Sequence, residues 1–337
     1  MKQMRYVPPV AAFVVVGALP AVLILSGWVW AALILLAVAG PAADTLLARG
    51  FGQGDGVDHR ADAGLVVLAL CHLAVLAVAV LRLSGGDLGW PQRVALFLAA
   101  GMYAGQVGHA VGHELIHRGA RGLFRLGAAV YVSMLFGHHV SAHRLVHHVH
   151  VATGADPNSA RTGEGFWRFA LRAWVGSFRA GLTAEQALSA RRAGRANPYL
   201  WWVGGGLACM IAVATLTGPH GLADYLGLSL YAQMQILLSD YVQHYGLRRR
   251  IAPDGRAEPV GPRHSWDSPH PVSSLMLVNA PRHADHHMNP LRPYPALRIP
   301  DNRPLLPYPI AVMAAIALIP PLWRRIMDRR VARMNQP

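Results

Sequence analysis

The sequence predicts an all-α integral membrane protein. Hydrophobic residues make up 53% of the 337 residues and charged residues only 14%, which is too apolar for a soluble domain of this length. Apolar runs of about 20 residues, the length that crosses a bilayer as a helix, recur along the chain. The arginines between these runs are distributed unevenly. Together these observations indicate a bundle of membrane-spanning helices.

Six apolar stretches are long enough to span a bilayer, and we expect the whole chain, residues 1–337, to form one domain around them. The first two stretches are separated only by a turn at residues 26–28. We place the spans at residues 7–27, 28–47, 63–83, 94–112, 199–217 and 222–241.

The positive charges predict how these spans are oriented. Arg82 and Arg93 fall on one side of the membrane, and the other Arg and Lys residues fall on the opposite side with both termini. Because cytoplasmic loops carry an excess of Arg and Lys, we expect both termini and the segments 113–198 and 244–337 to be cytoplasmic. The net charge of +14 suits the anionic lipid bilayer or an acidic protein, and we expect no nucleic-acid partner for so apolar a chain.

A seventh apolar stretch, residues 305–323, contains four prolines and is followed by Arg324, Arg325, Arg329 and Arg330. If it spanned the membrane it would carry these arginines to the outside, which the charge rule disfavours. We therefore expect an interfacial or re-entrant helix there.

Three histidine clusters predict a metal centre. They read HELIH at 113–117, HRLVHH at 143–148 and HADHH at 283–287, and a further histidine, His244, directly follows the sixth expected span. Neutral imidazole binds Fe, Cu, Zn and Ni near physiological pH. Histidines three to five residues apart share a helix face, so we expect each cluster to present its rings to one point. Eight clustered histidines predict more than one metal ion.

Other residues near these motifs are expected to have structural or supporting roles. Cys71 and Cys209 lie in apolar runs and read as small buried hydrophobic side chains. Four histidines share no face with a ligand set and are expected to be structural or to support the ligands: His109, His138, His139 and His150. Four residues are candidates to line a cavity, although lipid-facing or packing roles are favoured for each: Trp28, Trp30, Met102 and Leu237.

The HExxH pattern at residues 113–117 also matches the signature of zinc metalloproteases, in which the glutamate is the base. An intramembrane zinc protease therefore remains an alternative. That reading has to explain six further clustered histidines, although a catalytic zinc needs only about three protein ligands.

The motifs resemble those of the membrane-bound non-haem di-iron alkane hydroxylases, within the integral-membrane fatty-acid desaturase and hydroxylase superfamily. HELIHR at 113–118 is similar to the first histidine box, and AHRLVHHVHVATGADPNSAR at 142–161 is similar to the second with its continuation. DYVQHYGL at 240–247 resembles the HYG box that separates alkane hydroxylases from desaturases, and 264–298 resembles the third box. The matching segments run from about residue 108 to residue 331.

The resemblance implies two non-haem irons held by nine histidine ligands, with no bridging carboxylate presumed: His113, His117, His143, His147, His148, His244, His283, His286 and His287. Four carboxylates near these ligands are candidates to accept hydrogen bonds from imidazole N–H groups and so orient the rings: Glu114, Asp285, Asp240 and Asp156.

Two positions depart from the family pattern. Ala142 stands where the second box usually has Glu before its first histidine, and Gln243 stands where the HYG box usually has Glu. The loss of two anionic neighbours is expected to change the iron potential or the ring orientation, so the substrate or the rate can differ from the family's.

By the same resemblance, the enzyme is expected to hydroxylate a terminal carbon of an n-alkane or alkyl side chain in the bacterial inner membrane. The apolar substrate and O2 would arrive through the lipid bilayer. Because the sequence contains neither a CxxC pair nor a GxGxxG motif, electrons must come from a separate protein. The resemblance implies a rubredoxin-type or ferredoxin-type donor with an NAD(P)H-dependent reductase. Six arginines are candidates to dock it or to face anionic lipid: Arg191, Arg192, Arg195, Arg248, Arg249 and Arg250.

Two further activities of the same superfamily remain open. One is fatty-acyl desaturation or hydroxylation, and the other is oxidation of alkylbenzenes by a xylene-type monooxygenase. The HYG box favours alkane hydroxylation over desaturation.

Overall fold

The computed structural model describes residues 9–47, 60–191 and 196–335. Within these ranges the chain is helical, and its only β structure is two isolated bridges. The predicted all-α fold is therefore confirmed. Arg192 and Arg195, and the first two residues of the first expected span, lie outside the described residues.

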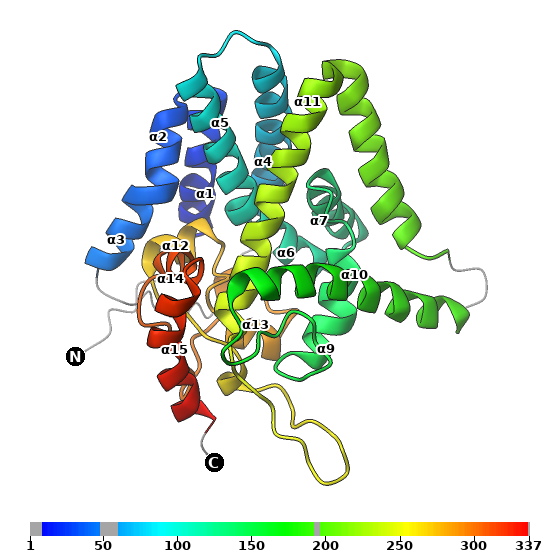
Figure 1. Cartoon of the computed structure of the whole chain (residues 1–337), viewed down its shortest axis with the longest axis vertical. Helices are drawn as coiled ribbons and strands as arrows, with labels where there is room; N and C mark the ends of the chain where they lie inside the picture. Colours follow the sequence, from blue (N-terminus) through cyan, green and yellow to red (C-terminus); the bar gives the residue numbers. More distant parts are fainter. Residues whose placement is uncertain (1–8, 48–59, 192–195, 336–337) are drawn as a thin grey trace.

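Long helices packed side by side form the upper part of the molecule (Figure 1). The first long helical rod is α1 (Val10–Leu25). The second is a continuous run of three elements, α2 (Val29–Ile34), the π-helix η1 (Leu35–Ala39) and α3 (Gly40–Leu46). The third is α4 (Ala61–Ser84). The fourth rod joins α5 (Trp90–Tyr103), the π-helix η2 (Ala104–Gly108) and α6 (His109–Ile116), and the last is α11 (Tyr199–His244).

Four of these helical runs are long and apolar enough to cross a membrane: Val29–Leu46, Ala61–Ser84, Trp90–Ile116 and Tyr199–His244. The 16 residues of α1 form a shorter apolar helix beside them. Inside the 46-residue α11, Gly218 has a φ of 70°, which glycine adopts without steric cost. This break bends α11 into two arms (Figure 1) that correspond to the fifth and sixth expected spans.

The fourth rod differs from the expected span at its lower end. The helix continues past residue 112 to Ile116, so His113 lies inside the helix instead of just beyond it. α7 (Arg121–Ser133) packs against α6 next to this end. The first histidine motif therefore lies largely within a helix whose residues 110–116 are buried.

The lower part of the molecule consists of short helices and α10 (Phe166–Ala190), which runs across the bundle instead of along it (Figure 1). The short elements are α8 (His139–Ala142), the π-helix η3 (His143–His147), α9 (His148–His150), η4 (Pro262–His264), α12 (Pro271–Met276), α13 (His283–Met288) and η5 (Tyr294–Ala296).

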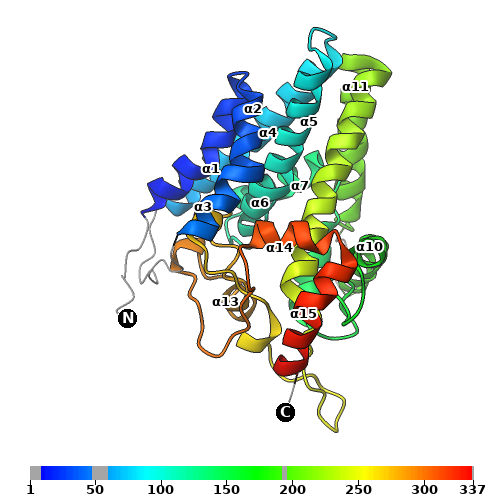
Figure 2. The same ribbon diagram turned by 60° about the vertical axis from the view of Figure 1, so that its left-hand side comes forward.

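The proline-rich stretch near the C-terminus forms two helices, α14 (Ile310–Ala317) and α15 (Pro320–Met334). The eight residues of α14 are too few to cross a bilayer. Figure 2 shows α14 lying across the base of the long helices, where an interfacial helix is expected.

Candidate metal centre

The nine histidines that the sequence singled out form two groups at the lower end of the bundle. The first group contains His113, His117, His143, His148 and His286, and the second contains His147, His244, His283 and His287. In each group, one nitrogen of every ring lies within 4.8 Å of the corresponding nitrogens of the others. Segments far apart in the sequence therefore converge on two adjacent points.

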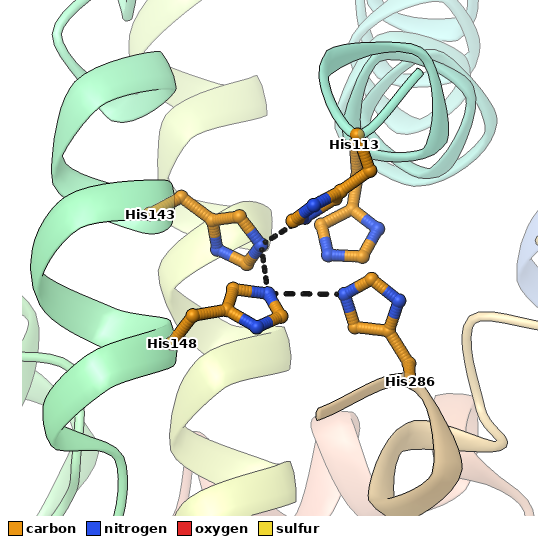
Figure 3. Close-up of side chains that lie close together, drawn as sticks. His113, His143, His148 and His286 are labelled. Carbon is orange, nitrogen blue, oxygen red and sulfur yellow. Dashed lines mark hydrogen bonds between the residues drawn. The ribbon is translucent and has the colours of Figure 1, made fainter. Parts of the chain in front are cut away.

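In the first group the rings face one another across a shared centre (Figure 3). The Nε2 atom of His143 lies 3.1 Å from that of His117 and 2.9 Å from that of His148. The Nε2 of His286 lies 3.1 Å from that of His148, and the Nε2 of His113 is buried without a hydrogen-bond partner among the described residues. Figure 3 shows these rings approaching from three different segments.

The second group repeats this geometry. The Nε2 of His283 lies 2.9 Å from that of His244 and 3.1 Å from that of His287. The Nε2 of His147 is buried and has no hydrogen-bond partner within the described chain. Its ring centroid is 4.7 Å from that of His244.

These contacts fit metal ligands better than hydrogen bonds. In a neutral imidazole each nitrogen either donates or accepts, so a succession of facing Nε2 atoms cannot all be paired. Nitrogens bound at about 2.1 Å to one ion lie about 3.0 Å apart when they are at right angles, and about 3.4 Å apart in a tetrahedron. The observed 2.9–3.1 Å is of this size. The nitrogens therefore lie as ligands of a shared metal ion would.

Burial keeps the imidazoles of the first group neutral, as metal ligands must be. Burial and neighbouring imidazoles lower the pKa of His143, His148 and His286 well below the usual range. Burial, together with Arg144 and Arg118, lowers the pKa of His117 to about 3. At neutral pH each ring therefore presents a lone pair.

The expectation that each cluster converges on one point holds only for HELIH. The second motif divides, because His143 and His148 join the first group and His147 joins the second. The cause is the π-helix η3, whose i→i+5 hydrogen bonding places residues five apart one turn above another. The third motif also divides, with His286 in the first group and its neighbours in the second.

An apolar cavity of about 590 Å³ opens beside the two histidine groups, which are called the metal groups from here on. It extends from His113, His143 and His283 between the long helices, and α12 and α14 form part of its floor. Its walls include Leu36, Met102, Met234, Leu238, Met276 and Ala315. Of the four candidate lining residues, Met102 lines this cavity, Leu237 lines a smaller one of about 230 Å³, and Trp28 and Trp30 are exposed on the outside of the bundle.

Comparison with known proteins identifies the family. The sequence model of the fatty acid desaturase family matches residues 88–314. The chain is 32% identical to alkane 1-monooxygenase 1 of Pseudomonas aeruginosa over 90% of its own length and 83% of the relative's. It is 33% identical to alkane 1-monooxygenase 2 of Alcanivorax borkumensis over 73% of its length, spanning 64% of that relative. The chain belongs to the alkane 1-monooxygenase family.

A more distant relative extends the range of substrates in this group of proteins. The chain is 27% identical to the xylene/toluene monooxygenase hydroxylase component XylM of Pseudomonas putida, over 88% of its own length and 80% of the relative's. As a member of the alkane 1-monooxygenase family, the chain is an oxidoreductase whose histidine groups are compatible with metal binding.

Of the four candidate carboxylates, Asp156 is the one seen hydrogen-bonded to a ligand ring. Its Oδ2 lies 2.8 Å from Nδ1 of His147 and also accepts a hydrogen bond from Ser159. Burial lowers the pKa of His147, but Asp156 raises it more, so the pKa of this ring lies above its usual value. This contact fixes the Nδ1–H tautomer and leaves Nε2 for the metal.

The other three carboxylates hold the backbone and polar partners around the site. Glu114 accepts hydrogen bonds from Arg118 and from the Tyr294 amide, each involving its Oε1 atom. Asp285 pairs with Arg292 and accepts from the Arg298 amide. Asp240 accepts from Asn158 at 2.6 Å. Since Glu114 is already bound by two donors, it is poorly placed as the base of a zinc protease.

The four histidines that were expected to be structural or to support the ligands belong to neither metal group. Nδ1 of His109 lies 3.0 Å from the Tyr131 hydroxyl, and His138 contacts Ser177. His139 is buried with its ring stacked on Phe136. His150 lies on the exposed face of α9.

Sequence reasoning missed Asp267, although it lies within a quoted motif. Its Oδ1 accepts a hydrogen bond from the Ala284 amide at 2.8 Å and so holds the first turn of α13. Burial raises the pKa of Asp267 to about 7. An acidic residue 16 positions before the histidine motif gives no local signal of this long-range contact.

The two departures from the family pattern have structural partners. The Nε2 of Gln243 donates to the Ala280 carbonyl at 3.3 Å, and its Oε1 accepts from Ser239 at 2.9 Å. A glutamate could not make the first contact when ionised. Ala142 packs against α10 at Gly181, where an added Cβ would lie 3.0 Å from the Ala142 nitrogen. These positions are therefore integrated into the packing of this chain.

Proposed function

We propose that the protein is a membrane di-iron monooxygenase that hydroxylates a terminal carbon of an n-alkane or an alkyl side chain. One observation carries the proposal: His113, His143 and His283 belong to the metal groups and also line the apolar cavity. An apolar chain lying in this cavity would have its end against the metal ligands. The kinship with alkane 1-monooxygenases supports the choice of reaction.

Each histidine group would hold one iron. His113, His117, His143, His148 and His286 would bind the first, and His147, His244, His283 and His287 the second. When bound, the irons supply the activation of O2. Nine neutral imidazoles add no negative charge, so the centre stays strongly cationic, which suits oxidation of an unactivated C–H bond.

The protein's side chains bind and orient the substrate. The walls of the cavity replace water around the hydrocarbon, which favours binding in proportion to the apolar area removed from water. Three rings of the metal groups, those of His113, His143 and His283, line this cavity, and most of the other lining side chains are apolar. Binding therefore places the terminal carbon at the metal groups and keeps water away from the reaction.

Electrons would come from a rubredoxin-type or ferredoxin-type protein that an NAD(P)H-dependent reductase reduces. Such carriers are commonly acidic, and Arg248, Arg249 and Arg250 lie in the lower part of the molecule that also holds the metal groups. We also propose that this end faces the cytoplasm of a bacterial inner membrane. The positive-inside rule supports that orientation, because Arg82 lies in the last turn of α4 and Arg93 in the first turn of α5, and Figure 1 shows these helix ends at the opposite end of the bundle.

Alkylbenzenes are a second class of candidate substrate. The similarity to XylM over 88% of the chain favours them, because that relative is named for xylene and toluene oxidation. Both classes present a methyl group on an apolar body, so the same cavity and metal groups can serve either.

The test is product formation by membranes that contain the protein, with a rubredoxin, its reductase, NAD(P)H and O2. We expect 1-octanol from n-octane and a benzylic alcohol from xylene. The variant His244→Ala removes one ligand of the second group and should lose both iron and product. The matched variant His220→Ala, at an exposed position beside the bend of α11, should keep both. No alcohol from either substrate in iron-loaded membranes would refute the proposal.

A further inference from the structure

A polar pair interrupts the apolar wall of the large cavity. Gln106 of η2 and Gln235 of α11 both line the cavity, and Nε2 of Gln106 donates to Oε1 of Gln235 at 3.1 Å. The lining around them is largely apolar, and it includes Met102, on the same rod as Gln106, and Met234, the residue before Gln235. A hydrocarbon makes no hydrogen bond to a carboxamide, so this pair has no role in binding a plain alkane.

The hydrogen-bond network determines which atoms of Gln106 remain for a ligand. Nε2 of Gln235 donates to the Gly101 carbonyl at 2.9 Å, which makes the other end of that amide the acceptor for Gln106. Gln106 must then donate to it, and its Oε1 has no partner among the described residues. Its second N–H is likewise unassigned. Gln106 thus offers one acceptor and one donor beside the cavity.

Close packing holds the pair in place. A Cβ at Gly105 would lie 2.7 Å from Nε2 of Gln235, so α11 can approach η2 this closely only because residue 105 is glycine. The carboxamide of Gln235 is therefore pressed against the backbone of η2. This leaves Gln106 as the member of the pair with hydrogen-bonding capacity to spare.

Gln106 lies on the same helical rod as the metal ligand His113, seven residues earlier. Both residues line the cavity. Seven residues of helix extend about 10 Å. An extended polypeptide advances about 3.5 Å for every three backbone bonds, and an extended carbon chain likewise advances about 1.2 Å per bond. About eight bonds therefore cover the roughly 10 Å between the positions of Gln106 and His113.

We propose that the cavity recognises an apolar chain that carries a hydroxyl group about eight bonds from the carbon to be oxidised. The hydroxyl donates to Oε1 of Gln106 and accepts from its second N–H, while the rest of the chain lies along the apolar wall. This inference rests on the proposed function and adds medium-chain alcohols to its substrates. The reaction is unchanged: one oxygen atom enters the terminal C–H bond, the other leaves as water, and the carrier supplies two electrons with two protons from solvent.

A purely structural role of the pair makes a different prediction. Glutamines that only joined η2 to α11 would affect all substrates alike, because their loss would loosen the helices. A glutamine that receives a hydroxyl affects alcohols and leaves alkanes largely unaffected. The ratio of kcat/KM for 1-octanol to kcat/KM for n-octane separates the two roles.

The experiment compares this ratio in the full-length protein and three variants in iron-loaded membranes with the carrier proteins. Gln106→Met has nearly the same volume and no hydrogen-bonding amide. Gln106→Met/Gln235→Met also removes the acceptor that the single variant leaves unpaired. The control is Leu98→Met on α5, a residue of the same rod that does not line the cavity.

We expect both Gln106 variants to lower the ratio about tenfold, because the loss of one good hydrogen bond weakens binding by about this factor. The control should leave the ratio unchanged. The wild type should give mainly 1,8-octanediol from 1-octanol, and the Gln106 variants a broader mixture of diols. An unchanged ratio and product distribution in the variants would overturn this inference while octane turnover upholds the proposed function. Absence of product from both substrates in the wild type would instead refute the proposed function.

Discussion

Nδ1 of His147 and Oδ2 of Asp156 lie 2.8 Å apart, and both side chains are buried. The aspartate sits in the loop that follows the second histidine motif, nine residues after the ring that it orients. Because Nδ1 carries the proton, the lone pair of Nε2 points into the second histidine group. Within the described part of the chain no other hydrogen bond orients this ring, so this one contact sets its ligand geometry.

The first prediction concerns this contact. Asp156→Ala should lower metal affinity at the second group by about 10–100-fold, because the ring loses the acceptor that fixes its tautomer. Iron retained after dialysis against a graded series of chelator concentrations measures the change. Asp254→Ala removes an exposed carboxylate from a turn and should leave retention unaltered. Equal retention by the two variants would remove Asp156 from this role.

The second prediction is that the two groups can be emptied separately. His143→Ala/His148→Ala deletes two ligands of the first group, and His283→Ala/His287→Ala deletes two of the second. Each double variant should bind about one iron per chain where the wild type binds about two, as measured by elemental analysis of purified protein. His150→Ala, at an exposed position two residues after the second motif, is the control. Complete loss of iron from both double variants would indicate one inseparable cluster.

A third prediction tests Gln243. Gln243→Glu restores the residue usual in the family but removes the donor to the Ala280 carbonyl and adds a charge near the buried Asp240. We expect the free energy of unfolding to fall by about 1–2 kcal/mol, seen as a lower midpoint of thermal unfolding in detergent. Gln92→Glu, at an exposed position in the first turn of α5, should change it little. An unchanged or higher midpoint for Gln243→Glu would show that the amide contact contributes nothing.

The fourth prediction is a pH dependence at the base of the bundle. Burial raises the pKa of Glu164, but hydrogen bonds from Arg172 and the Arg161 amide lower it more, so the folded pKa lies below the usual value. A depressed pKa stabilises the fold above the unfolded pKa of about 4.3, and this contribution is lost as the pH falls through the folded value.

Glu164→Gln should therefore lower the unfolding midpoint at pH 7 and pH 5.5, and the difference from wild type should shrink at pH 3.5. Thermal unfolding of both proteins at these three pH values checks the sign. Asp254→Asn, with an exposed carboxylate, provides the matched comparison. A difference that grows as the pH falls would contradict the assignment.

The helical fold and the histidine set could be predicted because both depend on local pattern. Apolar runs long enough to span a bilayer mark the long helices, and the spacing of the HELIH motif places His113 and His117 on one face. These signals lie within a few residues of one another. They do not depend on contacts with distant parts of the chain.

The division of the other two motifs could not be predicted in this way. In the second motif it depends on the π-turn between His143 and His147, whose i→i+5 bonding has no clear sequence signature. One partner of Glu114 is Tyr294, 180 residues later, and Asp285 is bonded because the segment 292–298 folds back onto it. The bend of α11 at Gly218 was anticipated only as a boundary between spans.

The division of the motifs has a mechanical consequence. His147 and His148 are covalent neighbours that serve different groups, and so are His286 and His287. Their ring centroids are 6.0 Å and 5.7 Å apart. One peptide link in each of these motifs would therefore hold ions bound in the two groups at a fixed separation. Neither link belongs to the long helices, so a cavity of different width between those helices would leave this separation unchanged.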